Sequence, residues 1–173
     1  FFHHQKFIKN KARRPLNPDE LPFMAHHLLY NIKTTQKNDY QVTSKTVFVK
    51  KKIKWGFLLS SRGCPFNCSF CSPSIRNSNG KNYRIQSPKR TADEIEFLVK
   101  KFAVNAISFE DDLFTLNKKR VIDLCKEIID RKIQISWTVA TRLDSIDLET
   151  AKWMKKAGCF GMSVGIESGS DRI

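Results

Sequence analysis

The sequence contains no long apolar run, and none of its stretches approaches the roughly 20 consecutive apolar residues that a membrane-spanning helix needs. It also lacks an initiating methionine and any signal-peptide pattern. Both ends look cut, so we expect the 173 residues to be a fragment of a longer protein. The 40% hydrophobic content is typical of a globular core.

Acidic residues are scarce relative to basic ones, with 17 Asp and Glu against 31 Lys and Arg, which gives a net charge of +14. The excess is largest in residues 1–56, which hold 12 basic and 3 acidic side chains. A basic arm can contact nucleic acid or an acidic partner. No aromatic–basic recognition motif accompanies the charge, so it favours a solvated arm without excluding nucleic acid, and it identifies no partner.

Cysteines are few, and their odd number of five does not fit a secreted disulfide scaffold. They fit a reducing interior, so we expect a cytoplasmic protein. Cys125 lies in a helical pattern and Cys159 follows a predicted helix end, and both are expected to be small buried hydrophobic residues. The other three, called here the motif cysteines, form a C-x3-C-x2-C pattern after an apolar strand-like stretch: Cys64, Cys68 and Cys71.

The motif cysteines can bind three corners of a cubic iron–sulfur cluster. The fourth iron then has no protein ligand, and a small molecule can bind there and be chemically changed. The spacing therefore predicts catalysis rather than a structural metal site. Zinc is the alternative, but it needs four ligands, and the only other nearby candidates are His26 and His27 because no second C-x2-C pair exists.

The chain changes character near residue 54. Residues 1–53 are irregular, with three prolines between positions 15 and 22 that predict an extended connector, a short helix around 24–30 and an edge strand over 42–49. From residue 55 on, the periodicity predicts strands over 55–60, 106–109, 134–140 and 160–166.

Three amphipathic helices are predicted between these strands. Thr91 can cap the first, with Glu94 completing a capping box, and Asn117 can cap the second. Asp147 begins the third helix, which Gly158 ends as a left-handed cap.

The alternation of strands and helices predicts an α/β fold with a parallel sheet and right-handed crossovers. Ligands gather at the C-terminal ends of the strands in such sheets. Polar or metal-binding residues follow all four predicted strands, so we expect one shared site. These are the motif cysteines, then Glu110, Asp111 and Asp112, then Thr141 and Arg142, and finally Glu167.

At these residues the sequence closely resembles the radical S-adenosylmethionine (SAM) enzymes, whose C-x3-C-x2-C motif lies on the loop after the first barrel strand. The matching segments, residues 61–72, 109–115 and 165–170, are similar to the subgroup that carries a cobalamin-binding domain ahead of the barrel. Anaerobic magnesium-protoporphyrin monomethyl ester cyclase-like proteins belong to it. Residues 19–23 resemble that subgroup's connector between the two domains.

The resemblance implies a partial TIM-type (β/α) barrel over residues 54–173, with about four of six β/α units. Residues 1–53 would be the interdomain arm that follows a cobalamin-binding domain outside this chain. The motif cysteines would ligate a [4Fe-4S] cluster, and SAM would chelate its open iron. The resemblance further implies anaerobic chemistry, an external one-electron reductant of flavodoxin or ferredoxin type and a small-molecule substrate, with cobalamin as a further cofactor.

The resemblance also implies contacts to SAM. Phe70 matches an aromatic position that packs near the adenine. Glu110, Asp111 and Asp112 stand where the family has a Gly-Gly-Glu segment that binds the SAM amino group. Because acids replace both glycines, backbone contacts are expected more than a simple side-chain match.

Two more residues complete the implied SAM site, since Arg142 could pair with the SAM carboxylate and Glu167 holds a ribose-contacting position. Other roles stay open from the residues alone. Asp111, Asp112 and Glu167 could cap helices, and Arg142 could form a surface salt bridge with Asp144.

The predicted activity is reductive cleavage of SAM to a 5′-deoxyadenosyl radical, or cobalamin-assisted methyl transfer, acting on an unknown substrate. Two alternatives stay open. A radical SAM RNA-modifying methylthiotransferase would explain the basic charge, but it should carry three further cysteines and an RNA-binding module. A non-enzymatic iron–sulfur or zinc-binding module is the other.

Overall fold

The computed structural model describes residues 2–3, 6–7, 11, 15–26, 28, 53–71 and 82–172. The predicted edge strand over 42–49 lies outside these residues, as do residues 27, 29 and 30 of the predicted helix around 24–30. In the N-terminal part, β1 (Phe2–His3) pairs with β2 (Lys6–Phe7), and the short 3-10 helix η1 (Pro18–Glu20) follows. Within the described ranges, no helix combines the length and the apolarity that crossing a bilayer would require.

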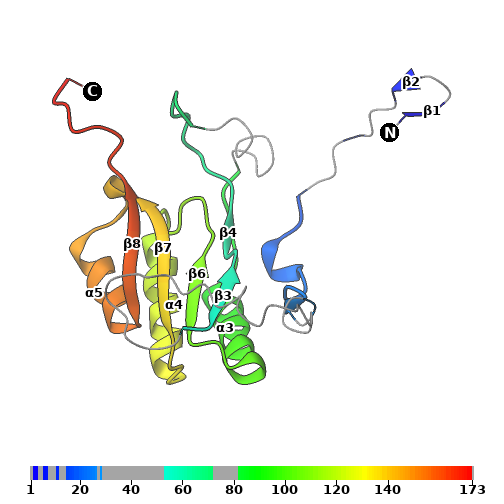
Figure 1. Cartoon of the computed structure of the whole chain (residues 1–173), viewed down its shortest axis with the longest axis vertical. Helices are drawn as coiled ribbons and strands as arrows, with labels where there is room; N and C mark the ends of the chain where they lie inside the picture. Colours follow the sequence, from blue (N-terminus) through cyan, green and yellow to red (C-terminus); the bar gives the residue numbers. More distant parts are fainter. Residues whose placement is uncertain are drawn as a thin grey trace.

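A four-stranded parallel sheet forms the centre of the structure (Figure 1). The strands lie side by side in the same order in which they follow one another in the chain, so the strand order does not reverse within this sheet. This is the order of a (β/α) barrel wall rather than of a doubly wound sheet. The predicted parallel α/β sheet is confirmed, with strand ends displaced by one or two residues: β3 (Trp55–Leu58), β6 (Ala106–Phe109), β7 (Ser136–Arg142) and β8 (Cys159–Gly165).

Three helices connect these strands: α3 (Pro88–Phe102), α4 (Lys118–Asp130) and α5 (Leu148–Lys156). α3 packs against α4, and α4 packs against α5, so the helices lie side by side along the sheet (Figure 1). Right-handed crossovers in sequential order place successive helices on the same face. One face of the sheet is therefore covered by helices, and among the described residues a pocket lies over the opposite face.

The core lies between the sheet and the helices, and Trp137 on β7 is the largest of its fully buried side chains. Its ring meets Phe109 edge to face and packs at a tilt on Phe114, with centroids 5.6 Å away in both cases. Its indole N–H donates to the Ala157 carbonyl oxygen at 2.9 Å. The core therefore buries a large aromatic side chain without leaving its polar atom unpaired.

Two of the three predicted helix starts are confirmed. The Asn117 side chain accepts a hydrogen bond from the Arg120 N–H at 3.0 Å and caps α4. The Asp147 carboxylate accepts from the Thr150 N–H at 2.8 Å and caps α5. Each cap satisfies a backbone donor that the first turn of a helix leaves without a partner.

The predicted capping box of the first helix is wrong, because α3 begins earlier in the chain. Ser87 Oγ accepts from the Arg90 N–H at 3.2 Å, and Pro88 occupies the first helical position. Thr91 lies inside the helix, where its hydroxyl donates to the Ser87 carbonyl oxygen at 3.0 Å. Serine followed by proline is the stronger start signal, since proline cannot donate and its φ is already helical.

Glu94 does not cap α3 but binds the N-terminal segment to this helix. The carboxylate is 3% exposed and accepts from the Met24 N–H at 3.2 Å, while His26 Nε2 lies 3.8 Å away. Burial works to raise the pKa of Glu94, but the donors from His26, Met24 and Gln86 together hold it below its usual value. The histidine that was a candidate zinc ligand thus belongs to this contact.

Gly158 joins α5 to β8 with a φ of +98°, which confirms the predicted left-handed cap. A Cβ here would collide with the backbone oxygen of Ile135.

Gly158→Ala should therefore lower the free energy of unfolding by more than about 1 kcal/mol, measured by urea denaturation. Gly169→Ala is the matched control, because its Cβ meets nothing within 4 Å. Equal stability of the two variants would contradict the prediction.

Candidate functional site

The motif cysteines lie on a loop whose two ends are held together at its base. The loop follows β3 and the short strand β4 (Ser61–Arg62), which pairs antiparallel with β5 (Arg84–Ile85) on the far side of the loop. The Gln86 N–H also donates to the Ser60 carbonyl oxygen at 2.8 Å. The sequence predicted the loop but not the small ribbon that closes it.

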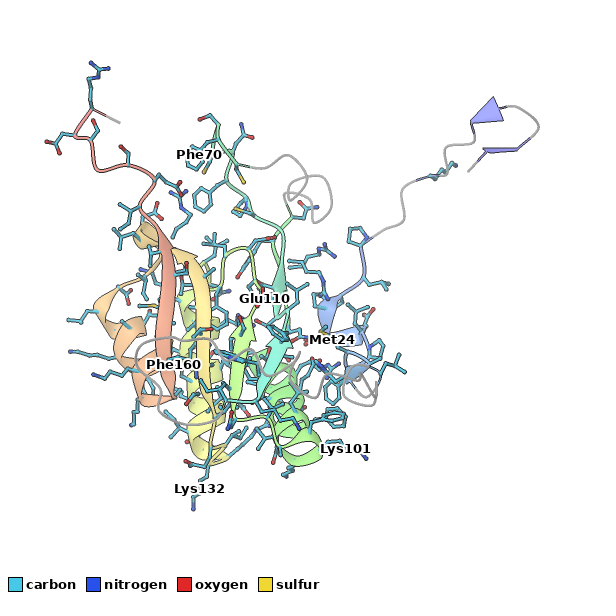
Figure 2. All side chains as sticks on the ribbon, in the orientation of Figure 1. Met24, Phe70, Lys101, Glu110, Lys132 and Phe160 are labelled. Carbon is cyan, nitrogen blue, oxygen red and sulfur yellow. The ribbon has the colours of Figure 1, made fainter. Side chains whose placement is uncertain are left out.

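One pocket of about 650 Å³ joins this loop to the C-terminal ends of β6, β7 and β8. It gathers seven of the nine predicted site residues, and Figure 2 shows Phe70 beyond the strand ends, well away from Glu110. The seven are the motif cysteines, Phe70, Asp112, Arg142 and Glu167. Parallel strands end at one edge of the sheet, which explains why residues distant in sequence meet here.

Arg142, the last residue of β7, contacts three groups at the pocket wall. Its Nε and Nη2 donate to the two Asp144 carboxylate oxygens at 2.9 and 2.6 Å, which forms the predicted alternative salt bridge. Nη1 donates to Cys68 Sγ at 3.3 Å, and the guanidinium lies 4.2 Å from the centre of the Phe66 ring. The hydrogen bonds to Asp144 raise the pKa of Arg142 further above its usual value. A permanent cation therefore lies beside one motif cysteine.

The three consecutive acids after β6 point to three different places. Asp112 lines the cysteine pocket. Asp111 is 2% exposed, and its carboxylate accepts hydrogen bonds from Ser60 and Ser61 beneath the cysteine loop. Glu110 accepts from the Ser108 hydroxyl at 2.6 Å. The sequence analysis predicted that these three acids bind SAM together, but the structure brings only Asp112 to the cysteine pocket. Glu110 and Asp111 do not line it.

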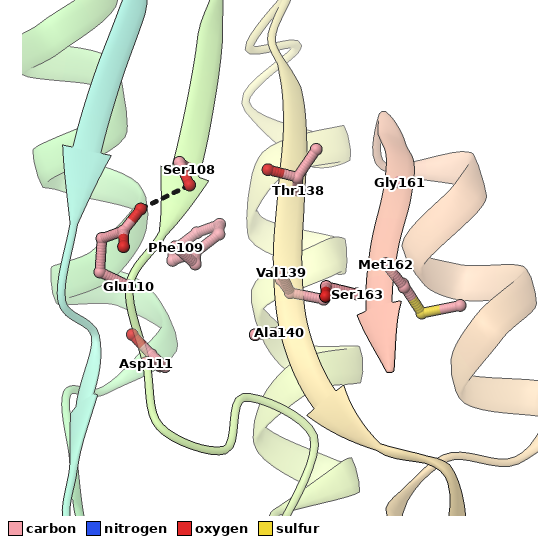
Figure 3. A pocket seen from close by; sticks show the side chains of 10 residues that line it. All are labelled: Ser108, Phe109, Glu110, Asp111, Thr138, Val139, Ala140, Gly161, Met162 and Ser163. Carbon is pink, nitrogen blue, oxygen red and sulfur yellow. Dashed lines mark hydrogen bonds between the residues drawn. The ribbon is translucent and has the colours of Figure 1, made fainter. Parts of the chain in front are cut away.

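Glu110 and Asp111 instead border a second pocket, of about 510 Å³, over the face of the sheet opposite the helices (Figure 3). Its floor is made of small residues that are neighbours in strand register, namely Ser108, Thr138 and Gly161. Sequence reasoning missed this pocket. One sequence signal could have indicated it. On both β6 and β7 a polar residue stands between side chains that are buried against the helices, so it must face the other side of the sheet.

The motif cysteines line one pocket as free thiols, which is the state that ligation of an iron–sulfur cluster needs. All five cysteines of the chain are thiols rather than disulfides. In the part of the chain that the structure describes, no three His, Cys, Asp or Glu side chains are grouped to hold one metal ion. A tetrahedral zinc needs such convergence, whereas each thiolate of a cubic cluster binds a different iron. Three free thiols that line one pocket fit the second requirement.

The family model described as the radical SAM superfamily matches residues 58–173. The chain belongs to the radical SAM superfamily. An uncharacterized methyltransferase of Pyrococcus horikoshii is 38% identical over 168 residues, which are 96% of this chain and 33% of that protein. The anaerobic magnesium-protoporphyrin IX monomethyl ester cyclase of Rubrivivax gelatinosus is 38% identical over 110 residues, which are 62% of this chain and 19% of that enzyme.

Solved structures of cobalamin-dependent radical SAM enzymes share the fold. Apo OxsB aligns with a TM-score of 0.68 at 21% identity, over 99% of this chain and 24% of that one. TsrM from Kitasatospora setae, with cobalamin and a [4Fe-4S] cluster bound, aligns with a TM-score of 0.62 at 23% identity, over 70% and 24%. The sheet and helices therefore form a partial TIM-type barrel, as predicted. The chain spans a third or less of the length of these relatives.

Cys125 is buried in the core, as the sequence predicted, whereas Cys159 is only partly buried and packs against the core. Burial raises the pKa of Cys125 to about 12 and that of Cys159 to about 11. Because only the thiolate is nucleophilic, about one molecule in a thousand or fewer is reactive at either position at pH 8.

In metal-free protein at pH 8, iodoacetamide should therefore modify the motif cysteines well before Cys125 and Cys159, as followed by peptide mass spectrometry. Raising the pH should increase the thiolate fraction and bring in Cys159 before Cys125, following their pKa values. Uniform labelling of all five thiols at pH 8 would contradict the raised pKa values of Cys125 and Cys159.

Proposed function

We propose that this chain provides the cluster-binding and SAM-binding part of a radical SAM enzyme. The supporting observation is the pocket that joins the motif cysteines to Asp112, Arg142 and Glu167. The motif cysteines would ligate a [4Fe-4S] cluster and leave one iron open to SAM. When bound and reduced, this cluster supplies the electron that cleaves SAM to methionine and a 5′-deoxyadenosyl radical.

The side chains around the cysteines have the charges that SAM requires. Asp112 offers a carboxylate to the amino group, and Arg142 offers a guanidinium to the carboxylate. Phe70 is 67% exposed at the pocket, which leaves its ring available to pack on the adenine. Glu167 has a φ of +64°, a conformation that costs energy outside glycine and concentrates at ligand sites, and it would contact the ribose.

The second pocket would hold a small-molecule substrate, and Glu110 would accept a hydrogen bond from it. The reaction would be hydrogen abstraction or cobalamin-assisted methyl transfer, which fits relatives that are named a methyltransferase and a cyclase. Residues 1–53 would then be the arm between a cobalamin-binding domain outside this chain and the barrel part over 54–173. A flavodoxin- or ferredoxin-type protein would supply the electron, in the cytoplasm and under anaerobic conditions.

Anaerobic reconstitution of the full-length protein with iron and sulfide tests the proposal. We expect a brown protein whose reduced EPR signal changes when SAM is added, and which cleaves SAM to 5′-deoxyadenosine. Cys68→Ala should remove both properties, because three thiolates are needed to hold the cluster. Cys125→Ala, a thiol in the helical core, is the matched control and should retain them. A signal that ignores SAM, or zinc bound in preference to iron, would refute the proposal.

A further inference from the structure

A buried polar network lies beneath the loop that carries the motif cysteines. It consists of Ser60, Ser61, Tyr83, Asp111 and Arg120, and is called here the loop-base network. Asp111 is 2% exposed and Arg120 is 3% exposed, although both carry charge in their usual ionisation states. Charged side chains are seldom buried this completely, and they require polar partners when they are.

Ser60 is the centre of the network, because all its polar groups are bound. Its N–H donates to Asp111 Oδ1 at 2.6 Å, and its hydroxyl donates to Asp111 Oδ2 at 2.7 Å. Its carbonyl oxygen accepts from Arg120 Nη2 at 3.3 Å. The peptide groups on either side of this residue are therefore oriented by a carboxylate and a guanidinium, and hydrogen bonds to charged groups are the strong ones.

The network also holds the far side of the loop. Ser61 donates to Asp111 Oδ2 at 2.7 Å, and Arg120 Nε donates to the Gln86 carbonyl oxygen at 3.3 Å. The Tyr83 hydroxyl donates to the Leu113 carbonyl oxygen at 3.1 Å. The network thus joins three segments: the chain that enters the cysteine loop, the chain that leaves it and the segment after β6.

Burying these two charged side chains lowers the stability of the folded state. Burial raises the pKa of Asp111 and lowers the pKa of Arg120, since both shifts favour the neutral form of a buried group. Each residue is the main charge that compensates the other. Burying two charges costs several kcal/mol before their attraction is counted, and such groups can serve to specify one geometry.

The geometry that the network specifies includes the pocket. Asp111 holds Ser60 and Ser61, which stand just before the first motif cysteine, while the next residue, Asp112, lines the cysteine pocket. A shift of the loop base relative to β6 would therefore change the separation between the motif cysteines and Asp112. In sites that bind metal, residues that orient the ligands influence affinity without touching the metal.

We propose that Asp111 and Arg120 are positioning residues, which fix the cysteine loop relative to Asp112 so that the cluster and the SAM amino group meet at a set distance. This inference rests on the proposed function. Neither residue touches SAM or the cluster in this role. Their effect is on the retention of the cluster and on its response to SAM.

Two adjacent acids and one exposed acid outside both pockets provide a matched test, because each substitution removes one negative charge. Asp111→Asn, Asp112→Asn and Glu149→Gln are introduced into the full-length protein, which is reconstituted anaerobically. Cluster loss to a chelator is followed by absorbance at fixed temperature, and the EPR spectrum is recorded with and without SAM. Thermal unfolding of each metal-free variant is measured beside them.

Asp111→Asn should lose its cluster at least about tenfold faster than the wild type, and its remaining cluster should respond weakly to SAM. Glu149→Gln should retain both the cluster and the response, because Glu149 is exposed on α5 and lines neither pocket. Asp112→Asn should retain the cluster but lose the response, because its side chain lies in the pocket. A merely structural role would lower the unfolding temperature of Asp111→Asn while leaving cluster loss and the SAM response of the folded protein unchanged.

If Asp111→Asn does not fold, Ser61→Ala decides the question, because it removes one hydrogen bond and keeps both charges. It should accelerate cluster loss by a smaller factor than expected for Asp111→Asn, whereas Ser136→Ala, at an exposed position on β7, should not. If both Asp111→Asn and Ser61→Ala lose the cluster at the wild-type rate and respond to SAM as the wild type does, the inference is wrong. If Asp111→Asn is unfolded, the same result for Ser61→Ala alone overturns it. A wild-type protein without a SAM-responsive cluster would instead overturn the proposed function.

Discussion

The carboxylate of Asp111 joins the end of β6 to the start of the cysteine loop, and the geometry of the pocket depends on this connection. A parallel sheet by itself brings strand ends to one edge, but it does not fix the loops that extend from them. A long loop between two strands needs fixed ends if its side chains are to hold a defined position. Here one end of the loop is fixed by a buried carboxylate, which accepts hydrogen bonds from backbone and hydroxyl donors at the base of the loop.

Much of the fold follows from the sequence pattern. Apolar runs alternating with amphipathic helices predict the parallel sheet, and Asn117 and Asp147 mark two helix starts, because each of these signals acts over a few residues. The first helix shows the limit of local signals. Ser87 and Thr91 can both cap a helix, and the choice between them depends on the proline that follows Ser87.

The candidate site was predictable as a location but not as an arrangement. The motif cysteines, Arg142 and Glu167 follow strands, and this placement alone predicts that they share a pocket. The directions of Glu110 and Asp111 could not be predicted, since they depend on which partners the fold places nearby. The same applies to Arg120, whose buried guanidinium donates to carbonyl oxygens of Ser60 and Gln86, which follow β3 and β5. Sequence patterns record polarity along the chain, whereas the burial of a charge is decided by residues distant in sequence.

The floor of the second pocket at Gly161 is formed by backbone, and a side chain there would press against Thr138 at 3.2 Å. Among the lining residues that the structure describes, the two pockets have only Ala140 in common. Changes around Gly161 can therefore reshape one chamber and leave the thiols of the other undisturbed. If the proposed function holds, related chains can differ in the substrates they accept and still share one site for cleaving SAM.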